Sequence, residues 1–156
     1  MEHPESQLVQ KTFTVKRLDL PPEVKMTRRS LLRWFALSTG LISEKESRST
    51  ILEVLDALFV ILISQKQNPT TLELQAHLKE KTGKIISEKL LLYHLKRLID
   101  LQLILRKRKK YFINPVPNAD STELHSSFEY WFARQLQESV VDIASATRLL
   151  SDSYQK

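Results

Sequence analysis

The sequence predicts a mainly α-helical fold with one small β-hairpin, and three observations predict it. The chain of 156 residues contains only two glycines and six prolines, too few for the many turns of an all-β fold. Apolar residues recur at helical spacing in several separate segments. Two short apolar triplets flank a run of cationic residues, which is the pattern of a hairpin. Because 42% of the residues are hydrophobic, the chain has enough apolar material for a core.

An N-terminal extension is predicted over residues 1–26. Residues 1–10 are polar, so we expect the extension to be partly disordered. Residues 13–18 alternate weakly between apolar and polar side chains and predict a short strand. Pro21 and Pro22 are expected to end that strand.

A flanking helix is predicted within residues 27–47. Thr27 fits the N-cap position, and broad apolar coverage continues to about Ser38. Gly40 fits the position after the C-cap, where a left-handed residue commonly ends a helix. The breadth of the apolar face indicates that this helix is buried between two layers.

The next helix is predicted over residues 51–63, where apolar side chains recur with helical spacing. Ser43 and Glu46 fit a capping box, in which the two residues satisfy each other's free amides. Ser49 and Thr50 are alternative starts for the same helix.

Two further helices follow in close succession. Thr70 and Glu73 fit a second capping box, which opens a helix that runs to about Lys81 and ends at Gly83. Ser87 is a suitable N-cap for the helix after it. The expected apolar stripes are Leu72, Leu74 and Leu78 in the first helix and Leu91, Leu95 and Leu98 in the second.

A β-hairpin is predicted from two apolar segments, Leu103–Leu105 and Tyr111–Ile113. The cationic run that joins them, Arg106–Lys110, would form its tip. The helices and this hairpin are expected to make one domain over residues 48–117.

Residues 118–156 are expected to form a long C-terminal helix, since no glycine or proline follows Ser121. About 30 helical residues would span about 45 Å. That length exceeds what a domain of this size covers, so part of the apolar stripe should meet a second chain. The stripe consists of Leu124, Phe128, Phe132, Leu136, Val140, Ile143 and Leu150.

The order of elements from Ser49 to Asn114 resembles the winged helix-turn-helix fold. The most specific part is Ile86-Ser87, followed by LLYHLKRL at 91–98 and LQLI at 101–104, which looks like the ArsR-, MarR- and PadR-like prokaryotic transcriptional regulators. These families usually have glycine where Gln102 stands. A left-handed backbone costs glutamine more than glycine, so we expect the turn here to be shaped differently.

The resemblance implies sequence-specific binding of double-stranded DNA by a homodimeric transcriptional regulator. If the leucines of the second helix of the pair point inward, its outer side can reach base edges and phosphates in the major groove. The basic hairpin would be a wing that contacts the phosphate backbone. The candidate DNA-binding residues are Lys89, Tyr93, Lys96, Arg97, Arg106, Lys107, Arg108, Lys109 and Lys110. The candidate dimerisation residues are Trp34, Phe128, Trp131, Phe132, Leu136, Val140 and Ile143.

Other interpretations stay open. The cationic run is alternatively a solvated turn that prevents edge pairing. Leu92, on the outer side, fits a thymine contact, a protein partner or a thicker core. Arg28, Arg29 and Arg33 are interpreted as solvated charges, with extra phosphate contact as the alternative. The alternative function is a winged-helix protein-interaction module within a transcription or replication assembly.

Composition and motifs indicate which classes of function to expect. The net charge of +6 favours an anionic partner, and the chain contains no cysteine for disulfides or thiolate zinc sites. His94 and the other three histidines are scattered, so we expect no metal and no cofactor. No phosphate loop, nucleophile elbow or paired-carboxylate motif is present, and we expect no enzyme. The longest apolar run, Val54 to Ile63, is too short for a membrane span, and no signal-peptide pattern occurs. We therefore expect a cytoplasmic protein that does not enter the membrane.

Overall fold

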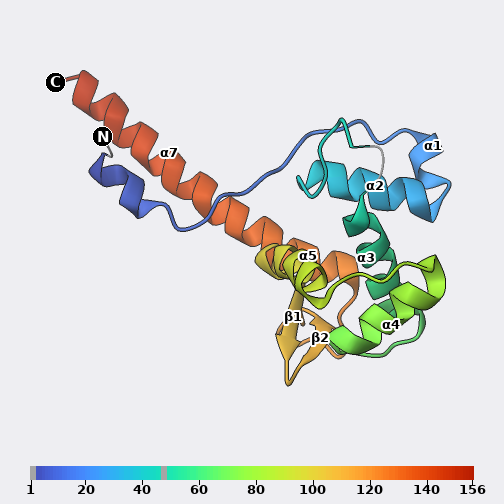
Figure 1. The fold of residues 1–156 in the computed structure, drawn as a ribbon. Coiled ribbons are helices and arrows are strands. Elements are labelled where there is room, and N and C mark those ends of the chain that lie inside the picture. Colours follow the sequence, from blue (N-terminus) through green and yellow to red (C-terminus); the bar gives the residue numbers. More distant parts are fainter. Residues whose placement is uncertain (1–2, 47–48) are drawn as a thin grey trace. The chain divides into compact units, whose positions relative to one another are not determined.

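The structure is a computed structural model that describes residues 3–46 and 49–156 (Figure 1). The described residues form helices and one two-stranded antiparallel sheet, which confirms the prediction of a mainly helical fold with a small hairpin. The chain divides into two compact units, residues 1–53 and 54–156. Residues 1 and 2 of the predicted extension, and the predicted boundary at residues 47 and 48, lie outside the described residues.

The first unit contains short helical elements followed by one longer helix: the 3-10 helix η1 (Pro4–Leu8), α1 (Pro22–Lys25) and α2 (Arg28–Ser38). The strand predicted over residues 13–18 is wrong, because that segment has no regular structure. Its described backbone contact is a hydrogen bond of 2.8 Å from Lys16 N to Ser38 O, which joins it to the end of a helix. A strand needs a neighbouring strand to share its hydrogen bonds, and none lies beside this segment in the described chain. Pro22 begins α1, where its fixed φ suits the first turn.

The ends of α2 are those that its sequence predicts. Thr27 Oγ1 accepts a hydrogen bond of 3.1 Å from Ser30 N at the N-terminus. At the other end Gly40 has φ 76°, and Leu41 N donates to Ala36 O at 2.8 Å. A Cβ atom on Gly40 would lie 2.6 Å from Thr14 Cγ2, so both the backbone conformation and the space require glycine.

The helix that contains the boundary between the two units begins at Thr50, one of the starts that the sequence allows. α3 spans Thr50–Phe59 and continues into the π-helical segment η2 (Val60–Ser64). Glu46 Oε1 accepts from Ser43 N at 3.1 Å, yet no helix begins there in the described residues. This hydrogen bond therefore closes a local turn, and the prediction of a helix-opening capping box at Ser43 is wrong.

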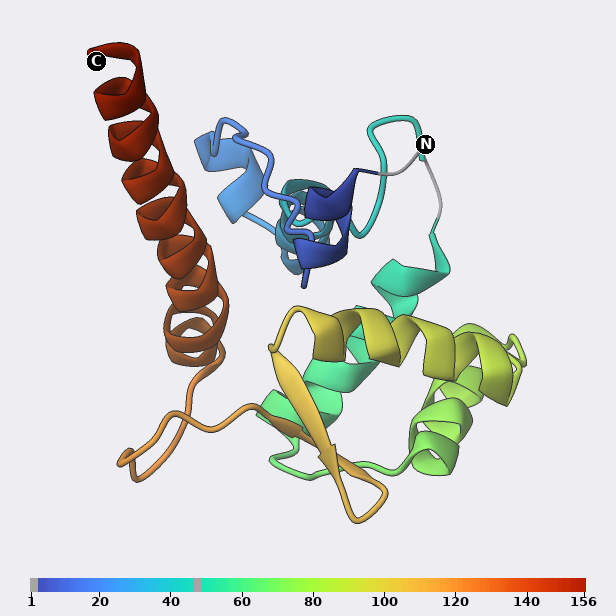
Figure 2. The ribbon, with the colours of Figure 1, turned by 90° about the vertical axis from the view of Figure 1, so that its left-hand side faces the viewer.

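The second unit contains the elements that the sequence predicts after α3. They are α4 (Thr71–Thr82), α5 (Glu88–Asp100), β1 (Ile104–Lys107), β2 (Lys110–Ile113), α6 (Leu124–Ser127), the π-helical segment η3 (Phe128–Ala133) and α7 (Arg134–Tyr154). Figure 2 shows α3, α4 and α5 crossing one another, with the hairpin continuing from the end of α5.

The core of this unit is formed by leucines on the inner sides of these helices. The fully buried side chains of the three helices include Val54, Leu55 and Leu58 of α3, Leu74 and Leu78 of α4, and Leu91, Leu95 and Leu98 of α5. Leu72 was predicted in the stripe of α4, but it is 65% exposed, and that part of the prediction is wrong. Residues 74 and 78 are one helical turn apart, whereas residue 72 lies on a different side of the helix.

Side-chain caps define the ends of α4 and α5, as predicted. Thr70 Oγ1 accepts from Glu73 N at 3.2 Å, and Ser87 Oγ accepts from Leu90 N at 3.2 Å. Gly83 ends α4 with φ 73°. These local signals set where α5 starts, and so which of its residues face the core.

The hairpin is attached to the start of α4 by its second strand. The two strands pair in a register that sets Arg106 opposite Tyr111 and Lys107 opposite Lys110. Tyr111 is buried: its backbone N–H donates to Pro69 O at 2.9 Å, and its hydroxyl lies 3.0 Å from Thr71 Oγ1. An isolated antiparallel bridge also joins Thr70 to Lys110. The hairpin is therefore held at the start of α4 as well as by its connection to α5.

The turn after α5 keeps the left-handed shape in spite of its glutamine. Gln102 has φ 60°, its N–H donates to Ile99 O at 2.8 Å, and Leu103 N donates to Leu98 O at 3.3 Å. This is the hydrogen-bond pattern that a glycine usually completes at a helix end. The expectation of a differently shaped turn is thus wrong. Asn114 supports the turn, because its Nδ2 donates to Gln102 O at 2.9 Å.

The C-terminal helical elements α6, η3 and α7 follow one another without a break from Leu124 to Tyr154, which confirms a long helical region, but residues 118–123 of the predicted range are not helical. Near their start Phe132 and Ser127 are buried, and Ser127 Oγ donates to Leu103 O at 3.4 Å. No residue of α7 is buried. The beginning of this helical region is therefore packed against the unit, and α7 is not.

We predict that Gln102→Gly stabilises the protein. Relief of the left-handed strain should exceed the larger chain entropy of glycine in the unfolded state, with a net gain of about 0.5–1 kcal/mol in the free energy of unfolding. Urea unfolding followed by circular dichroism measures the change. Gln102→Ala is the matched control: it removes the same side chain but keeps the strain, and it should give no gain. A decrease in stability in both variants would show instead that the glutamine side chain makes a needed contact.

Candidate nucleic-acid interface

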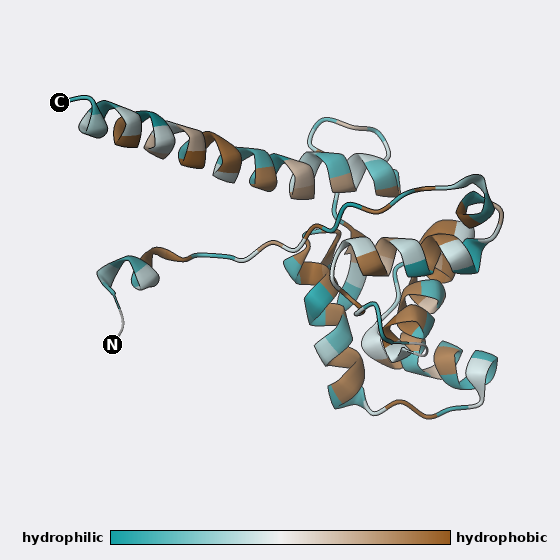
Figure 3. Ribbon diagram, turned by 90° about the horizontal axis from the view of Figure 1, so that it is seen from above, coloured by the Kyte–Doolittle hydropathy of each residue, from teal (hydrophilic) through white to brown (hydrophobic). Residues whose placement is uncertain are grey.

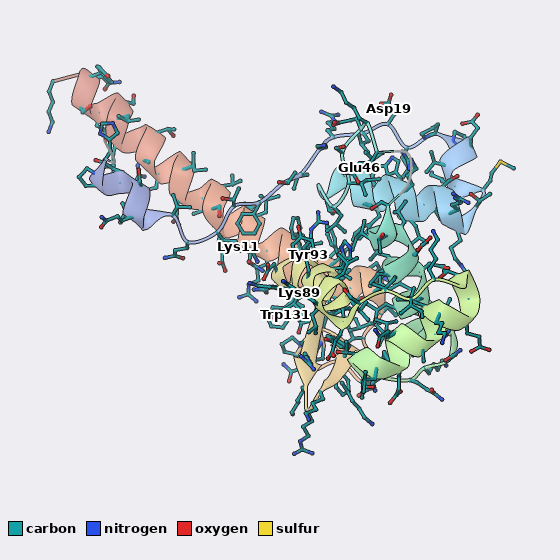
Figure 4. The ribbon with its side chains drawn as sticks, in the orientation of Figure 1. Lys11, Asp19, Glu46, Lys89, Tyr93 and Trp131 are labelled. Atoms are coloured by element: carbon teal, nitrogen blue, oxygen red, sulfur yellow. The ribbon has the colours of Figure 1, made fainter. Side chains whose placement is uncertain are left out.

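The outer side of α5 carries four of the nine candidate DNA-binding residues that the sequence nominates. Because Leu91, Leu95 and Leu98 point inward, the helical period turns Lys89 and Tyr93 outward. Figure 4 shows both on α5. Tyr93 is 58% exposed, and Lys89 and Lys96 are also exposed. The structure therefore brings these three candidates to the solvent-facing side of one helix.

Arg97 is the fourth candidate on α5, and its guanidinium group is held over a neighbouring ring. Its Cζ lies 5.8 Å from the centroid of the Tyr93 ring, within the range of a cation–π interaction. Arg97 is half-buried, as is Leu92. Arg97 and Tyr93 are thus in contact with each other on the outer side of α5. Leu92 is neither fully exposed nor part of the fully buried core.

The hairpin carries a cluster of cations at positions where the backbone conformation and the strand pairing disfavour them. Arg108 and Lys109, the two residues of the turn, have φ 53° and 68°. Two-residue hairpin turns of this kind prefer Asn-Gly, because both positions need a positive φ. Lys107 and Lys110 stand directly opposite each other, and like charges so placed repel. Another sequence would form this hairpin at lower cost, so its cations are not needed to shape it.

The charges of this hairpin are exposed and largely uncompensated. Arg106 lies with its Cζ 5.4 Å from the Tyr111 ring centroid, which holds it against its own strand pair. In the part of the chain that the structure describes, Lys107, Arg108 and Lys109 have no acidic partner. We call Arg106–Lys110 the basic hairpin. It offers cationic donors to an anionic partner without first breaking an ion pair.

One titratable side chain of α5, His94, faces inward. His94 is 8% exposed, and its buried Nδ1 atom has no hydrogen-bond partner among the residues that the structure describes. Burial lowers the pKa of His94, and the positive charge of Arg97 lowers it further. Both effects disfavour the protonated imidazole in the folded state.

The candidate dimerisation residues fall into separate groups. Trp34 belongs to the first unit, where its Nε1 donates to Asp19 O at 2.7 Å. Trp131 Nε1 donates to Pro115 O at 3.0 Å. Phe128 is stacked on Phe132 with ring centroids 5.0 Å apart. Leu136 is half-buried, whereas Val140 and Ile143 are exposed. Phe132 is already covered by its own chain, so Val140 and Ile143 have the most surface left for a partner.

Sequence reasoning missed the contacts that attach the hairpin to the start of α4. Neither Pro69 nor Thr71 was nominated, although both meet Tyr111. The available signal was the tyrosine itself, since a buried phenol requires a polar partner. Arg33, interpreted from the sequence as a solvated charge, donates to Glu46 O within the first unit.

Comparison of the chain with protein-family models, with the curated proteins and with the solved structures gives no match. No helix among the described residues is long and apolar enough to cross a membrane. Within the same residues no group of three or more His, Cys, Asp or Glu side chains is arranged to hold a metal ion. The chemistry of the site therefore has to be argued from its own cations and aromatic side chains.

We predict that His94 makes the protein less stable as the solution is acidified. The pKa is lowered in the folded state, so the unfolded chain takes up the proton first when the pH falls below its ordinary value of about 6.5. Stability then decreases down to the folded pKa, with a slope of at most about 1.4 kcal/mol per pH unit for one proton. Urea unfolding at several pH values between 7 and 5 measures it. In His94→Leu this component of the pH dependence should disappear; an unchanged slope would assign it to another group.

Proposed function

We propose that residues 50–114 form a winged helix-turn-helix domain that binds double-stranded DNA sequence-specifically, as part of a transcriptional regulator. The order of α3, α4, α5, β1 and β2 supports this fold. So does the Thr70–Lys110 bridge, which attaches the hairpin to the helix pair. A protein that binds genomic DNA has to be in the compartment that contains it, which agrees with the cytoplasmic location expected from the sequence.

The observation that carries the proposal is the division of α5 into two sides. Three leucines bury its inner side, and Lys89, Tyr93, Lys96 and Arg97 occupy its outer side. An α-helix fits the major groove of B-DNA, where arginine pairs with guanine O6 and N7. Tyr93 can donate to a phosphate or pack on a thymine methyl group, and the lysines can reach phosphates. In this proposal α5 is the recognition helix.

The basic hairpin would be the wing. Cationic side chains that neutralise phosphates release counterions, which supplies affinity for any sequence. The strain at Arg108 and Lys109 supports this role, since a hairpin that only had to turn would use residues suited to a positive φ. The wing would position the domain, and α5 would read the sequence.

The second candidate is a winged-helix module that binds another protein inside a transcription or replication assembly. The observation that favours it is the exposure of apolar side chains on α7, including Val140, Ile143 and Leu150. Such a module would bind random duplex weakly, and its partner binding would survive neutralisation of the basic hairpin.

We predict that neutralising the basic hairpin weakens binding to every duplex alike. Lys107, Arg108 and Lys109, all changed to Gln, should reduce the slope of log affinity against log salt by about 0.9 for each phosphate that is no longer neutralised, and by about 2.7 at most. Fluorescence anisotropy with a labelled random duplex at 50–200 mM salt measures the slope.

A matched control removes the same charge elsewhere. Lys45, Lys66 and Lys79 are exposed and lie outside both α5 and the hairpin. Their change to Gln lowers the net charge equally and should alter the slope much less. Equal slopes for the two triple variants would mean that only net charge matters, and retained affinity in the hairpin variant would favour the protein-interaction module.

We predict that Arg97→Ala and Tyr93→Ala reduce discrimination between DNA sites. Selection from a pool of random duplexes supplies the preferred sequence, and competition against a scrambled duplex measures discrimination. A residue that reads a base should contribute about 1–3 kcal/mol. Lys79→Ala, on α4, should leave the ratio unchanged. If discrimination persists in both α5 variants, these residues contact the backbone or nothing, and the assignment of α5 as the reading element fails.

A further inference from the structure

The α7 helix is the longest helix of the described chain, and most of its large apolar side chains are exposed to solvent. Its 21 residues include none that is buried. Figure 3 shows apolar positions recurring along its length. The exposed large apolar side chains are Val140, Val141, Ile143, Leu149, Leu150 and Tyr154.

A helix with this composition has little reason to be stable alone. In proteins most of the stability of a helix comes from the packing of its apolar side and not from intrinsic helix propensity. Here Val140, Val141, Ile143 and Thr147 are β-branched, which lowers helix propensity. An ion pair between Arg134 and Glu138 at 3.7 Å, four residues apart, adds only a few tenths of a kcal/mol. Most of the stability of such a helix must come from packing of its apolar side.

The apolar side of α7 follows a seven-residue repeat. Leu136, Ile143 and Leu150 are spaced by seven. Val140, Thr147 and Tyr154 form a second line with the same spacing, three or four residues from the first. These two lines are the a and d positions of a coiled coil, and the seam they make is narrow enough to suit one other helix.

Charge is excluded from the edges of this seam. The flanking e and g positions are all uncharged and mostly small: Gln137, Ser139, Ala144, Ala146, Ser151 and Ser153. The charged residues of α7 all lie at the remaining positions: Arg134, Glu138, Asp142, Arg148 and Asp152. Two copies of this surface can therefore approach closely without bringing like charges together, which makes the surface complementary to itself.

We propose that α7 pairs with α7 of a second copy of this chain in an antiparallel coiled coil. In the register that joins every a position to a d position, Leu136 meets Tyr154, Val140 meets Leu150, and Ile143 meets Thr147. The antiparallel orientation sets the two helix dipoles in opposition, which favours it. A parallel pair would instead place the two Thr147 side chains against each other.

Thr147 and Tyr154 carry the two hydroxyl groups of the seam, and the hydroxyl group of Thr147, nearer its middle, is already satisfied. Its Oγ1 donates to Ala144 O at 2.6 Å within the same helix. It can therefore be buried against Ile143 without leaving a donor unpaired. Burial of the seam then breaks no hydrogen bond within the protein.

The register also sets how far apart the two copies stand. From Leu136 to Tyr154 is 18 residues, which is about 27 Å at 1.5 Å per residue. The two Leu136 residues, near the starts of the two α7 helices, would be separated by this length along the pair. It is of the order of one turn of B-DNA, about 34 Å. Pairing through α7 would thus suit two copies of the proposed DNA-binding domain, although it does not depend on that function.

The molar mass in solution tests the pairing. Light scattering on the intact chain at about 100 µM should give twice 18.2 kDa. Ile143→Glu places a charge in the seam and should weaken pairing at least tenfold. Ser145→Glu is the matched control, since it lies on the same helix outside the seam and should stay dimeric. Because both positions are exposed in the single chain, neither change should unfold it, and circular dichroism checks this.

A monomeric wild-type chain would overturn the proposal and would mean that the first unit or another protein covers α7. Equal weakening by the two glutamates would also overturn it, because pairing would then not use the seam.

The orientation has a separate test, which the absence of cysteine makes clean. Val140→Cys mixed with Leu150→Cys should form a disulfide-linked dimer on oxidation, and each variant alone should not. Crosslinking of each variant with itself would indicate a parallel pair and overturn the proposed register. The salt dependence of DNA binding measured on Ile143→Glu separates the two proposals: a monomer that binds DNA leaves the proposed function intact, and a dimer that binds none leaves the pairing intact.

Discussion

The burial of three leucines on one side of α5 is the constraint on which the rest of the second unit depends. Leu91, Leu95 and Leu98 are almost completely removed from solvent. At about 1.5–3 kcal/mol for each buried leucine, their transfer is comparable to the whole net stability of a small domain, even as an upper estimate. Rotating α5 by one residue, about 100°, would expose them. The outward position of Lys89 and Tyr93 is therefore a consequence of core packing, and needs no contribution from a bound partner.

The basic hairpin depends on a second buried side chain. The tip contains a strained turn and a facing pair of lysines, both unfavourable when considered alone. Tyr111 offsets that cost, because it buries a ring in the core, bonds to Thr71 and receives support from Pro69 through its backbone. The charged tip and its buried base are thus two parts of one arrangement. The favourable packing and hydrogen bonds of Tyr111 at the base offset the unfavourable free energy of the turn and of the facing lysines at the tip.

Local chemistry explains which parts of the fold were predictable. Thr27, Thr70 and Ser87 are caps whose hydrogen bonds close within three residues, so nothing distant decides them. The strand expected at residues 13–18 failed because a strand exists only with a neighbour, and the neighbour of this segment is a helix end. The expectation of a differently shaped turn at Gln102 failed for another reason. Glutamine disfavours a left-handed backbone, but the hydrogen bonds of the helix end and of Asn114 hold Gln102 in that conformation.

The sequence by itself determined the helices, their caps, the hairpin, and the concentration of cations at its tip, because these follow from periodicity and from contacts within a few residues. It also determined that α7 has a seam without charge at its edges. Only the tertiary structure decided which candidates stand free. In that structure Leu72 is exposed, Phe132 is buried and Arg97 is half-buried. The second strand, β2, is joined to the start of α4. Those outcomes depend on the packing of side chains far apart in sequence, which no local pattern specifies.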